Sequence, residues 1–216
     1  QPIEIKDRSI SLYERMVPIK FKHQKITVNL PKNINNVLDS LDSKGRLYAV
    51  DKDTYAVSMA REDIASDKRF TLKHGCFSDL EDYSKEWGIH GSINGILFDL
   101  GVSSHHLDEA GRGFSFNKNG PIDMRFDQSS GISACEWLET VDEQTLSHII
   151  WKYGDERYSR RIARAIVYQR DQEKISDTGQ LAKIIDKAMP RNEKHKHNAT
   201  RTFQAIRIFM NKELEV

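Results

Sequence analysis

The sequence is poor in cysteine, in long apolar runs and, ahead of Gly45, in glycine. Its two cysteines, Cys76 and Cys135, lie far apart, and their spacing fits neither a zinc site nor a disulfide framework. No window approaches the roughly 18 consecutive apolar residues that a membrane-spanning helix needs. The first residues also lack the basic, apolar and small-residue succession of a secretory signal. We therefore expect a protein of the cytoplasm, with two unpaired thiols and no membrane partner.

Charge is balanced overall but uneven along the chain. The formal net charge is +1, yet residues 152–212 hold 15 Lys and Arg against 7 Asp and Glu, an excess of eight positive charges. Such clustering is typical of a surface that attracts phosphate groups. A solvated helical face explains the same composition, so charge alone leaves both interpretations open.

Strands alternate with helical segments in the first half of the chain. Apolar runs at 45–51, 69–73 and 93–99 predict strands. Asp53 and Ser78 suit the N-caps of the helices that follow the first two runs. This alternation predicts βαβ units and a parallel sheet.

Beyond a glycine-rich region that ends near Gly131, the pattern predicts helices only. The candidates are residues 132–140, 143–153, 156–170, 178–189 and 199–213. In the third candidate, four arginines at i, i+3, i+4 and i+7 form one basic face, namely Arg157, Arg160, Arg161 and Arg164. Its apolar and aromatic residues, among them Ile162, Ile166 and Tyr168, favour the other side and are expected to pack on neighbouring helices.

Three side chains that follow the predicted strands are candidates for ligand binding. Asp51 could accept hydrogen bonds from adjacent ribose hydroxyls, because a carboxylate only accepts. Phe77 could stack on an adenine ring. Asp99, ahead of Gly101, could accept a hydrogen bond from an exocyclic amino group. Structural interpretations stand beside these: an ordinary strand-ending acid, a core phenylalanine, and an N-cap acid for a helix over 102–108.

The adjacent residues His105 and His106 do not predict a metal site. Neighbouring positions on a helix point to different faces, and the single acid nearby is Asp108. The Gly111-Arg-Gly113 segment lacks the third glycine of a dinucleotide-binding loop and follows no predicted strand. We therefore expect neither a metal ion nor that loop here.

Six motifs, in order, make the chain resemble the RsmH (MraW) family of methyltransferases. They are Asp-Leu-Gly-Val-Ser-Ser (99–104), Arg-Gly-Phe-Ser-Phe (112–116), Gly-Pro-Ile-Asp-Met-Arg (120–125), Tyr-Gly-Asp-Glu-Arg (153–157), Arg-Ile-Ala-Arg-Ala-Ile (161–166) and Ala-Thr-Arg-Thr-Phe-Gln-Ala-Ile-Arg-Ile (199–208). The resemblance runs from about Gly45 to the last residue. It implies transfer of a methyl group from S-adenosylmethionine to the N4 amino group of a cytidine in the decoding region of bacterial 16S rRNA.

The resemblance also implies roles for individual residues. Cofactor contacts fall on Asp51, Phe77, Asp99 and His106, the last at a position that is usually glutamine. Asp99 is also the first candidate to hold the amino protons of the cytidine, and the Ser103 hydroxyl is the second.

The substrate side of the site is implied in the same way. Asp123 and Arg125 would shape the cytidine pocket. The contacts to rRNA phosphates would come from Arg157, Arg160, Arg161, Arg164, Lys194, Lys196 and Arg201. A base inside folded RNA must be splayed out to reach such a site, which suits a cleft between two domains.

The fold implied by the resemblance is an α/β class I (Rossmann-like) methyltransferase sheet, here incomplete, with an inserted all-helical domain. The expected divisions are 1–25 unassigned, 26–104 partial α/β core, 105–198 helical substrate domain and 199–216 a helix that returns to the core. The expected partner is the 16S rRNA of the small ribosomal subunit, and a homodimer is one alternative for the oligomeric state.

The chain departs from the family pattern at both ends. Residues 26–38 contain no glycine where the family has a glycine loop after its first strand, and the chain stops at Val216 where the family continues with further strands. An eroded gene, a fragment or mis-read start, and omitted residues are three explanations that stay open. The sequence thus predicts an rRNA methyltransferase with impaired cofactor binding. The alternative is a non-catalytic RNA-binding remnant, while the loop motifs disfavour a small-molecule or DNA methyltransferase.

Overall fold

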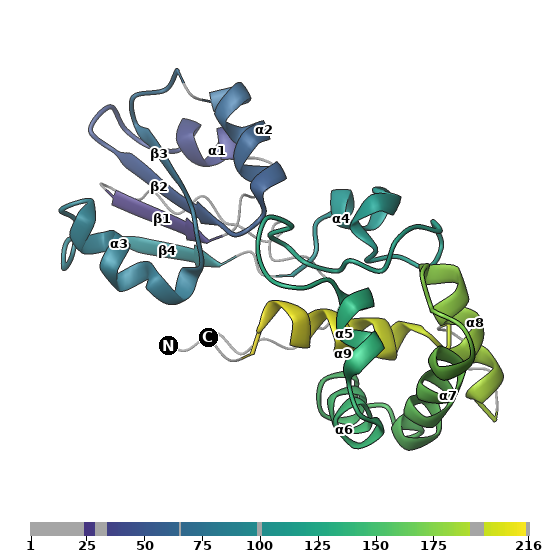
Figure 1. Cartoon of the computed structure of the whole chain (residues 1–216). Helices are drawn as coiled ribbons and strands as arrows, with labels where there is room; N and C mark the ends of the chain where they lie inside the picture. Colours follow the sequence, from purple (N-terminus) through teal and green to yellow (C-terminus); the bar gives the residue numbers. More distant parts are fainter. Residues whose placement is uncertain (1–23, 29–33, 65, 99–100, 191–196, 215–216) are drawn as a thin grey trace. The chain divides into compact units, whose positions relative to one another are not determined.

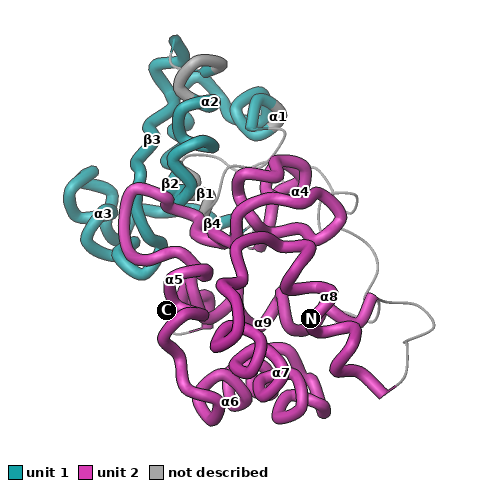
Figure 2. The backbone as a smooth tube through the Cα atoms, turned by 45° about the vertical axis from the view of Figure 1, so that its right-hand side comes forward, with its two compact units in different colours: residues 1–99 teal, residues 100–216 magenta. Residues whose placement is uncertain are grey.

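The computed structural model describes residues 24–28, 34–64, 66–98, 101–190 and 197–214. Contacts between residues divide the chain into two compact units, a first unit of residues 1–99 and a second unit of residues 100–216 (Figure 2). Each unit has its own apolar core. The division at residue 99 falls at the end of the predicted strand 93–99, ahead of the glycine-rich region.

The first unit contains a four-stranded parallel sheet (Figure 1). Its strands are β1 (Gln24–Val28), β2 (Arg46–Asp51), β3 (Phe70–His74) and β4 (Gly95–Phe98), in the order β3-β2-β1-β4. Every described pair is parallel, so the carboxyl ends of the strands lie at one edge. The predicted parallel sheet is confirmed. The strand pattern in the sequence does not predict β1, which lies between β2 and β4.

Helices cover both faces of this sheet (Figure 1). They are α1 (Ile34–Asp39) and α2 (Thr54–Ile64) on one face and α3 (Leu80–Glu86) on the other. Leu47 and Ala49 of β2 are fully buried in one apolar cluster with residues of α1 and α2. Tyr48, between them, contacts Trp87 at the end of α3, with ring centroids 5.0 Å apart. Strand β2 is therefore covered on both faces, as expected for a parallel sheet.

The two predicted N-caps of the first unit have different outcomes. The carboxylate of Asp53 accepts the Tyr55 N–H at 3.0 Å, so its predicted capping of α2 is confirmed. The prediction for Ser78 is wrong. Ser78 lies inside a 3-10 turn, η1 (Phe77–Asp79), and Asp79 takes the N-cap position of α3. The chain already turns at Phe77, so the Ser78 hydroxyl donates to the Asp79 carboxylate at 3.1 Å instead.

The second unit is helical after an irregular loop region. Its elements are α4 (Ser104–Asp108), the 3-10 turn η2 (Ala110–Arg112), α5 (Ala134–Thr140), α6 (Glu143–Gly154), α7 (Ser159–Gln172), α8 (Thr178–Ala188) and α9 (Thr200–Asn211). The predicted helical segments match α5 to α9 closely. Helix α9 packs along α6 within this unit. The boundaries implied by the resemblance, 26–104, 105–198 and 199–216, stay predictions.

The packing faces of α7 follow the prediction except at Tyr168. Ile162 and Ile166 are fully buried in the core of the second unit, as predicted. Tyr168, predicted on the same side, is 68% exposed. At about 100° per residue, Tyr168 lies some 200° around the helix from Ile166. It therefore shares the solvent side with Arg161 and Arg164, at i, i+3 and i+7. The described helices of both units are all too short or too polar to span a bilayer.

Candidate functional site

Asp51 ends β2 at the carboxyl edge of the sheet. Asp51 is buried, and its Oδ1 accepts the Asp53 N–H at 2.8 Å. Its backbone carbonyl accepts the Gly75 N–H at 3.0 Å, just after the neighbouring strand β3. These contacts fix the acid where ligands bind in open α/β sheets. The structure therefore places this predicted residue at the expected edge.

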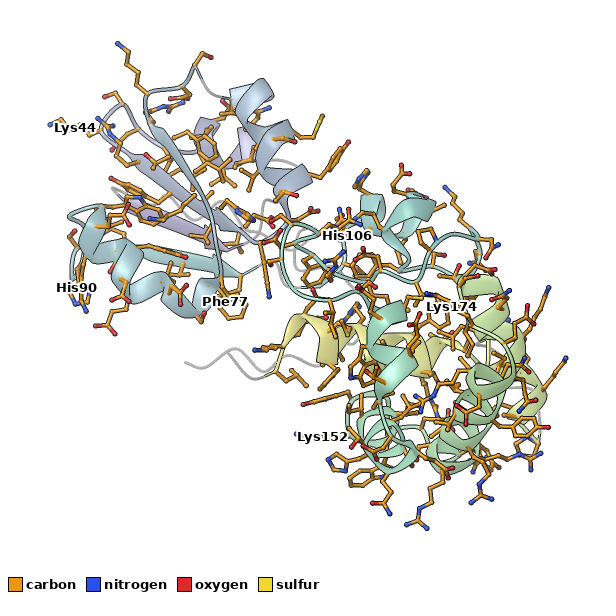
Figure 3. All side chains as sticks on the ribbon, viewed as in Figure 1. Lys44, Phe77, His90, His106, Lys152 and Lys174 are labelled. Atoms are coloured by element: carbon orange, nitrogen blue, oxygen red, sulfur yellow. The ribbon has the colours of Figure 1, made fainter. Side chains whose placement is uncertain are left out.

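Phe77 follows β3 at the same edge and is half-buried (Figure 3). Its ring meets Phe98 edge to face, with centroids 6.1 Å apart and an interplanar angle of 78°. Phe98 ends β4 and is 47% exposed. Together the two rings form an aromatic surface beside the strand ends. The interpretation of Phe77 as a core residue is not supported, because it lies outside the buried cluster of the first unit. Phe98 was not predicted, although its place beside Asp99 is a usable signal.

Asp99 lies outside the described residues, directly after Phe98. The described residues after it nevertheless test whether Asp99 is the N-cap of the helix predicted over 102–108. Helix α4 has Ser103 as its N-cap, and the Ser103 hydroxyl accepts the His106 N–H at 3.3 Å. The interpretation of Asp99 as the cap of this helix is therefore wrong, because the helix begins at Ser104, five positions further on.

His106 completes a reciprocal cap at the start of α4 (Figure 3). Its Nδ1 accepts the backbone N–H of Ser103 at 3.0 Å. The third helical position of such a cap is usually Glu or Gln, so the imidazole nitrogen replaces a carboxylate or amide oxygen. The ring is 5% exposed and contacts Phe114 and Phe126, with centroids 4.9 and 5.1 Å away. His106 thus supports the local fold, and its contact to a cofactor stays a prediction.

Two loop segments lie against each other in the region 110–126. Gly113 has a φ of +70°, and a Cβ built there would lie 2.3 Å from the carbonyl oxygen of Pro121. Only glycine fits both the left-handed backbone and this close approach. The buried Arg112 donates to the carbonyls of Arg125 and Phe126 at 3.1 and 2.9 Å. The Arg-Gly-Phe motif therefore holds the loop that carries Asp123 and Arg125.

Asp123 and Arg125 bind each other. Arg125 Nε and Nη2 donate to Asp123 Oδ1 and Oδ2 at 2.9 and 2.7 Å. Arg125 Nη1 donates to the carbonyls of Ser130 and Gly131 at 3.2 and 2.8 Å. Burial alone would raise the pKa of Asp123, but hydrogen bonds from the side chain and backbone of Arg125 hold it below its ordinary value. The pair closes the 123–131 loop, and its contact with a cytidine stays a prediction.

The predicted basic face on α7 is exposed. Arg160 and Arg161 lie in α7, whereas Arg157 precedes it, with its guanidinium 4.8 Å from the centre of the Tyr158 ring. Arg164 pairs with Glu143 at 3.4 Å. Such an exposed pair is worth little and leaves the arginine free to exchange partners. The four arginines can therefore reach an anion in solvent.

The other predicted phosphate contacts are less open. Arg201 lies 3.9 Å from the carboxylate of Glu156, which is almost fully buried. This contact joins the Tyr-Gly-Asp-Glu-Arg motif to α9, so Arg201 has a structural part. Lys194 and Lys196 lie outside the described residues. Within the described ranges, no group of three or more His, Cys, Asp or Glu side chains is placed to hold a metal ion.

The fold and the strand-end residues define a class of protein. A parallel sheet in the order β3-β2-β1-β4 with helices on both faces matches the first four strands of the doubly wound arrangement that binds nucleotides. An acid ends β2 and an aromatic residue follows β3, and these residue types can accept from ribose hydroxyls and stack on a base. The chain belongs to the MraW methylase family, which matches residues 27–216. Membership implies a class I methyltransferase fold.

Similar curated proteins carry the name ribosomal RNA small subunit methyltransferase H. One from Acinetobacter baumannii is 52% identical over 179 residues, which cover 83% of this chain and 57% of the relative. One from Hydrogenovibrio crunogenus is 50% identical over 180 residues, with the same coverage. One from Alteromonas mediterranea is 45% identical over 219 residues, which cover 100% of this chain and 70% of the relative. The chain thus spans 57% of the length of the first two relatives.

Proposed function

We propose that this chain is an rRNA methyltransferase whose two units bind the cofactor and the RNA. The reaction proposed is methyl transfer from S-adenosylmethionine to the N4 amino group of a cytidine in the decoding region of 16S rRNA. The observation that carries the proposal is the family match over residues 27–216, which includes both units. The names of the relatives support a small-subunit rRNA as substrate.

The carboxyl edge of the sheet fits the nucleoside part of the cofactor. Asp51 has one carboxylate oxygen oriented by the Asp53 N–H, and such a group accepts from two neighbouring hydroxyls. The Phe77 and Phe98 rings offer an apolar surface for an adenine. His106, in the second unit, is proposed as a cofactor contact on the family resemblance alone. When bound, S-adenosylmethionine supplies an electrophilic methyl group.

The chemistry required of the protein is mainly positioning. The amino group of cytosine is a poor nucleophile, since its lone pair is delocalised into the ring. Acceptors that hold its protons leave the lone pair aimed at the methyl group. Asp99, directly after β4, is the proposed acceptor, and it would take the amino proton that N4 loses as the N–CH3 bond forms and the S–CH3 bond breaks. The Ser103 hydroxyl is the second candidate, and it has a further lone pair besides the one that accepts the His106 N–H.

The second unit is proposed to hold the RNA. The exposed arginines Arg157, Arg160, Arg161 and Arg164 would contact phosphates, with Lys194, Lys196 and Arg201 as further contacts. The Asp123–Arg125 pair would shape the cytidine pocket through the loop backbone that it closes. Phosphate contacts position an RNA without selecting its sequence.

A non-catalytic RNA-binding protein is the second candidate function. It is favoured by the segment after β1, Asn29-Leu-Pro-Lys-Asn33, which has no glycine to let backbone approach the methionine part of the cofactor. This candidate uses the basic surface of the second unit alone. Its RNA binding would be sensitive to salt and indifferent to S-adenosylmethionine.

Two measurements separate the candidates. Isothermal titration with S-adenosylmethionine is expected to show binding that Asp51→Ala weakens at least tenfold, while the exposed Asp82→Ala on α3 leaves it unchanged. Methyl transfer to purified small subunits, read at nucleotide resolution, is expected at a cytidine N4 and should be lost in Asp99→Ala. No cofactor binding and no transfer, with salt-sensitive RNA binding that Asp99→Ala does not alter, would establish the second candidate.

A further inference from the structure

A groove lies between α7 and α8 in the second unit, where the two helices run side by side (Figure 1). Its volume is about 330 Å³, within the range of small-ligand sites. Ile175 and Ile184 contribute apolar lining. Most of the other residues along it are of polar type, and they come from α7, from α8 and from the connection that contains Lys174 (Figure 3). None of these residues has a part in the cofactor site.

Tyr168 lines the groove from α7 and is 68% exposed. Among the residues that the structure describes, none makes a ring contact or hydrogen bond with Tyr168. A large aromatic side chain left in solvent beside an apolar-lined groove offers a face on which a planar group can stack. Every nucleic acid base has such a face, so stacking of this kind does not depend on sequence.

Lys183 and Lys187 line the groove from α8. Their i, i+4 spacing places two like charges on one helix face, which is mildly unfavourable without an anion. Within the described part of the chain, neither ammonium group forms an ion pair. Lys174, also at the groove, pairs with Glu139, and Glu173 is the single acid of the lining. The groove therefore has an excess of positive charge from Lys183 and Lys187.

The groove continues the basic face of α7. Arg161, Arg164 and Tyr168 follow one another at i, i+3 and i+7, so they share one side of the helix. A chain of phosphates that contacts the arginines would reach the groove at Tyr168. A positive surface that ends in an exposed aromatic ring is the arrangement by which proteins hold single-stranded nucleic acid.

We propose that the α7–α8 groove binds one nucleotide of a single-stranded RNA segment. The base stacks on Tyr168, and the phosphate lies between Lys183 and Lys187. Gln180 uses its Oε1 to accept the Ser176 N–H at 2.9 Å, and its amide hydrogens remain as donors for a base edge. This proposal rests on the proposed function, because it assumes an RNA substrate. It assigns a contact to RNA outside the pocket of the methylated base.

The test measures binding of a fluorescein-labelled single-stranded RNA of about ten nucleotides to the 216-residue chain by anisotropy. Tyr168→Ala is expected to weaken binding at least about fivefold, whereas Tyr168→Phe keeps the ring and stays within about twofold. The double variant Lys183→Gln/Lys187→Gln should weaken binding and lower the slope of log affinity against log salt by about 1.4. Lys44→Gln/Lys68→Gln in the first unit removes the same charge and serves as the control.

Three outcomes would refute the proposal that the α7–α8 groove binds RNA. They are no RNA binding by the unaltered chain, equal affinities for the groove and control variants, or the same loss in Tyr168→Phe as in Tyr168→Ala. A poly-glutamate peptide that binds with the same dependence on these variants would assign the groove to acidic polypeptides instead. All substituted side chains are exposed, and circular dichroism verifies that the variants fold.

Failure of the groove and failure of the proposed function are distinguishable. The RNA assay needs no cofactor, so a chain that fails to bind S-adenosylmethionine can still show the dependence on Tyr168. Conversely, the chain could transfer methyl groups while the Tyr168 and lysine substitutions leave its RNA affinity unchanged. That result would refute RNA binding in the groove and would not affect the proposed function.

Discussion

Asn211, the last residue of α9, holds the loop that contains the Asp-Met-Arg motif. It is 5% exposed. Its Nδ2 donates to the Met124 and Arg207 carbonyls at 2.7 and 2.9 Å, and its Oδ1 accepts the Phe126 N–H at 2.7 Å. Met124 is fully buried and has a φ of 62°. A residue other than glycine adopts that left-handed backbone conformation only when its surroundings impose it.

The change Asn211→Ala is therefore expected to destabilise the second unit strongly. It removes the hydrogen bonds of the Met124 carbonyl and the Phe126 N–H to this side chain. Each buried polar group that loses its partner costs about 1–3 kcal/mol. Partial relaxation of the loop reduces the sum, so we expect the free energy of unfolding to fall by about 2–4 kcal/mol. Asn117→Ala, an exposed amide in the same unit, should change it by less than about 0.5 kcal/mol.

Urea unfolding followed by far-ultraviolet circular dichroism measures both variants, because the helical second unit dominates the signal. The slope of the free energy on urea concentration should stay unchanged, since the surface exposed on unfolding is the same. Equal stabilities for Asn211→Ala and Asn117→Ala would refute the reasoning. In that case the three contacts of Asn211 would contribute nothing beyond those that water supplies.

Three further predictions concern single residues. Because pairing with Arg125 lowers the pKa of Asp123 below its ordinary value of 3.8, its contribution to stability is present above that value and is lost as pH falls through the lowered pKa. Asp123→Asn should therefore lose less stability than the unaltered chain on acidification, as urea unfolding at a series of pH values would measure. Ser133→Ala removes the capping box of α5 and should lower stability by about 1 kcal/mol, measured in the same way; an unchanged value would contradict this. Burial raises the pKa of the Cys135 thiol, so it should react more slowly with a thiol reagent near pH 8 than Cys76 does, when each is the only cysteine left; equal rates would disprove it.

Much of the candidate site follows from local sequence signals. Each signal is local: a strand ends in Asp51, a turn begins at Asp53, and the aromatic Phe77 follows the next strand. Parallel strands then bring their carboxyl ends to one edge, so Asp51 and Phe77 are expected at the same edge without further information. Helices α5 to α9 are predictable for the same reason, because apolar spacing acts within a few positions, as do the side-chain N-caps of α5, α6 and α8.

Contacts between distant segments could not be predicted in this way. Strand β1 is five residues long and partly polar, and only its pairing with β2 and β4 makes it an inner strand of the sheet. Arginine is a residue type that often contacts RNA, yet the Arg125 guanidinium donates to Asp123 and to two loop carbonyls. Ser103 and His106 likewise hydrogen-bond each other at the start of α4.

The sequence by itself determined the family, the alternation of strands and helices, and the acid and aromatic residue at the edge of the sheet. These depend on short-range periodicity, capping and residue type, which are visible in the chain. Only the tertiary structure decided that Tyr168 faces solvent beside two lysines and that Asn211 holds the backbone of a motif 87 positions away. Those properties depend on which helices lie next to each other, and long-range packing sets that.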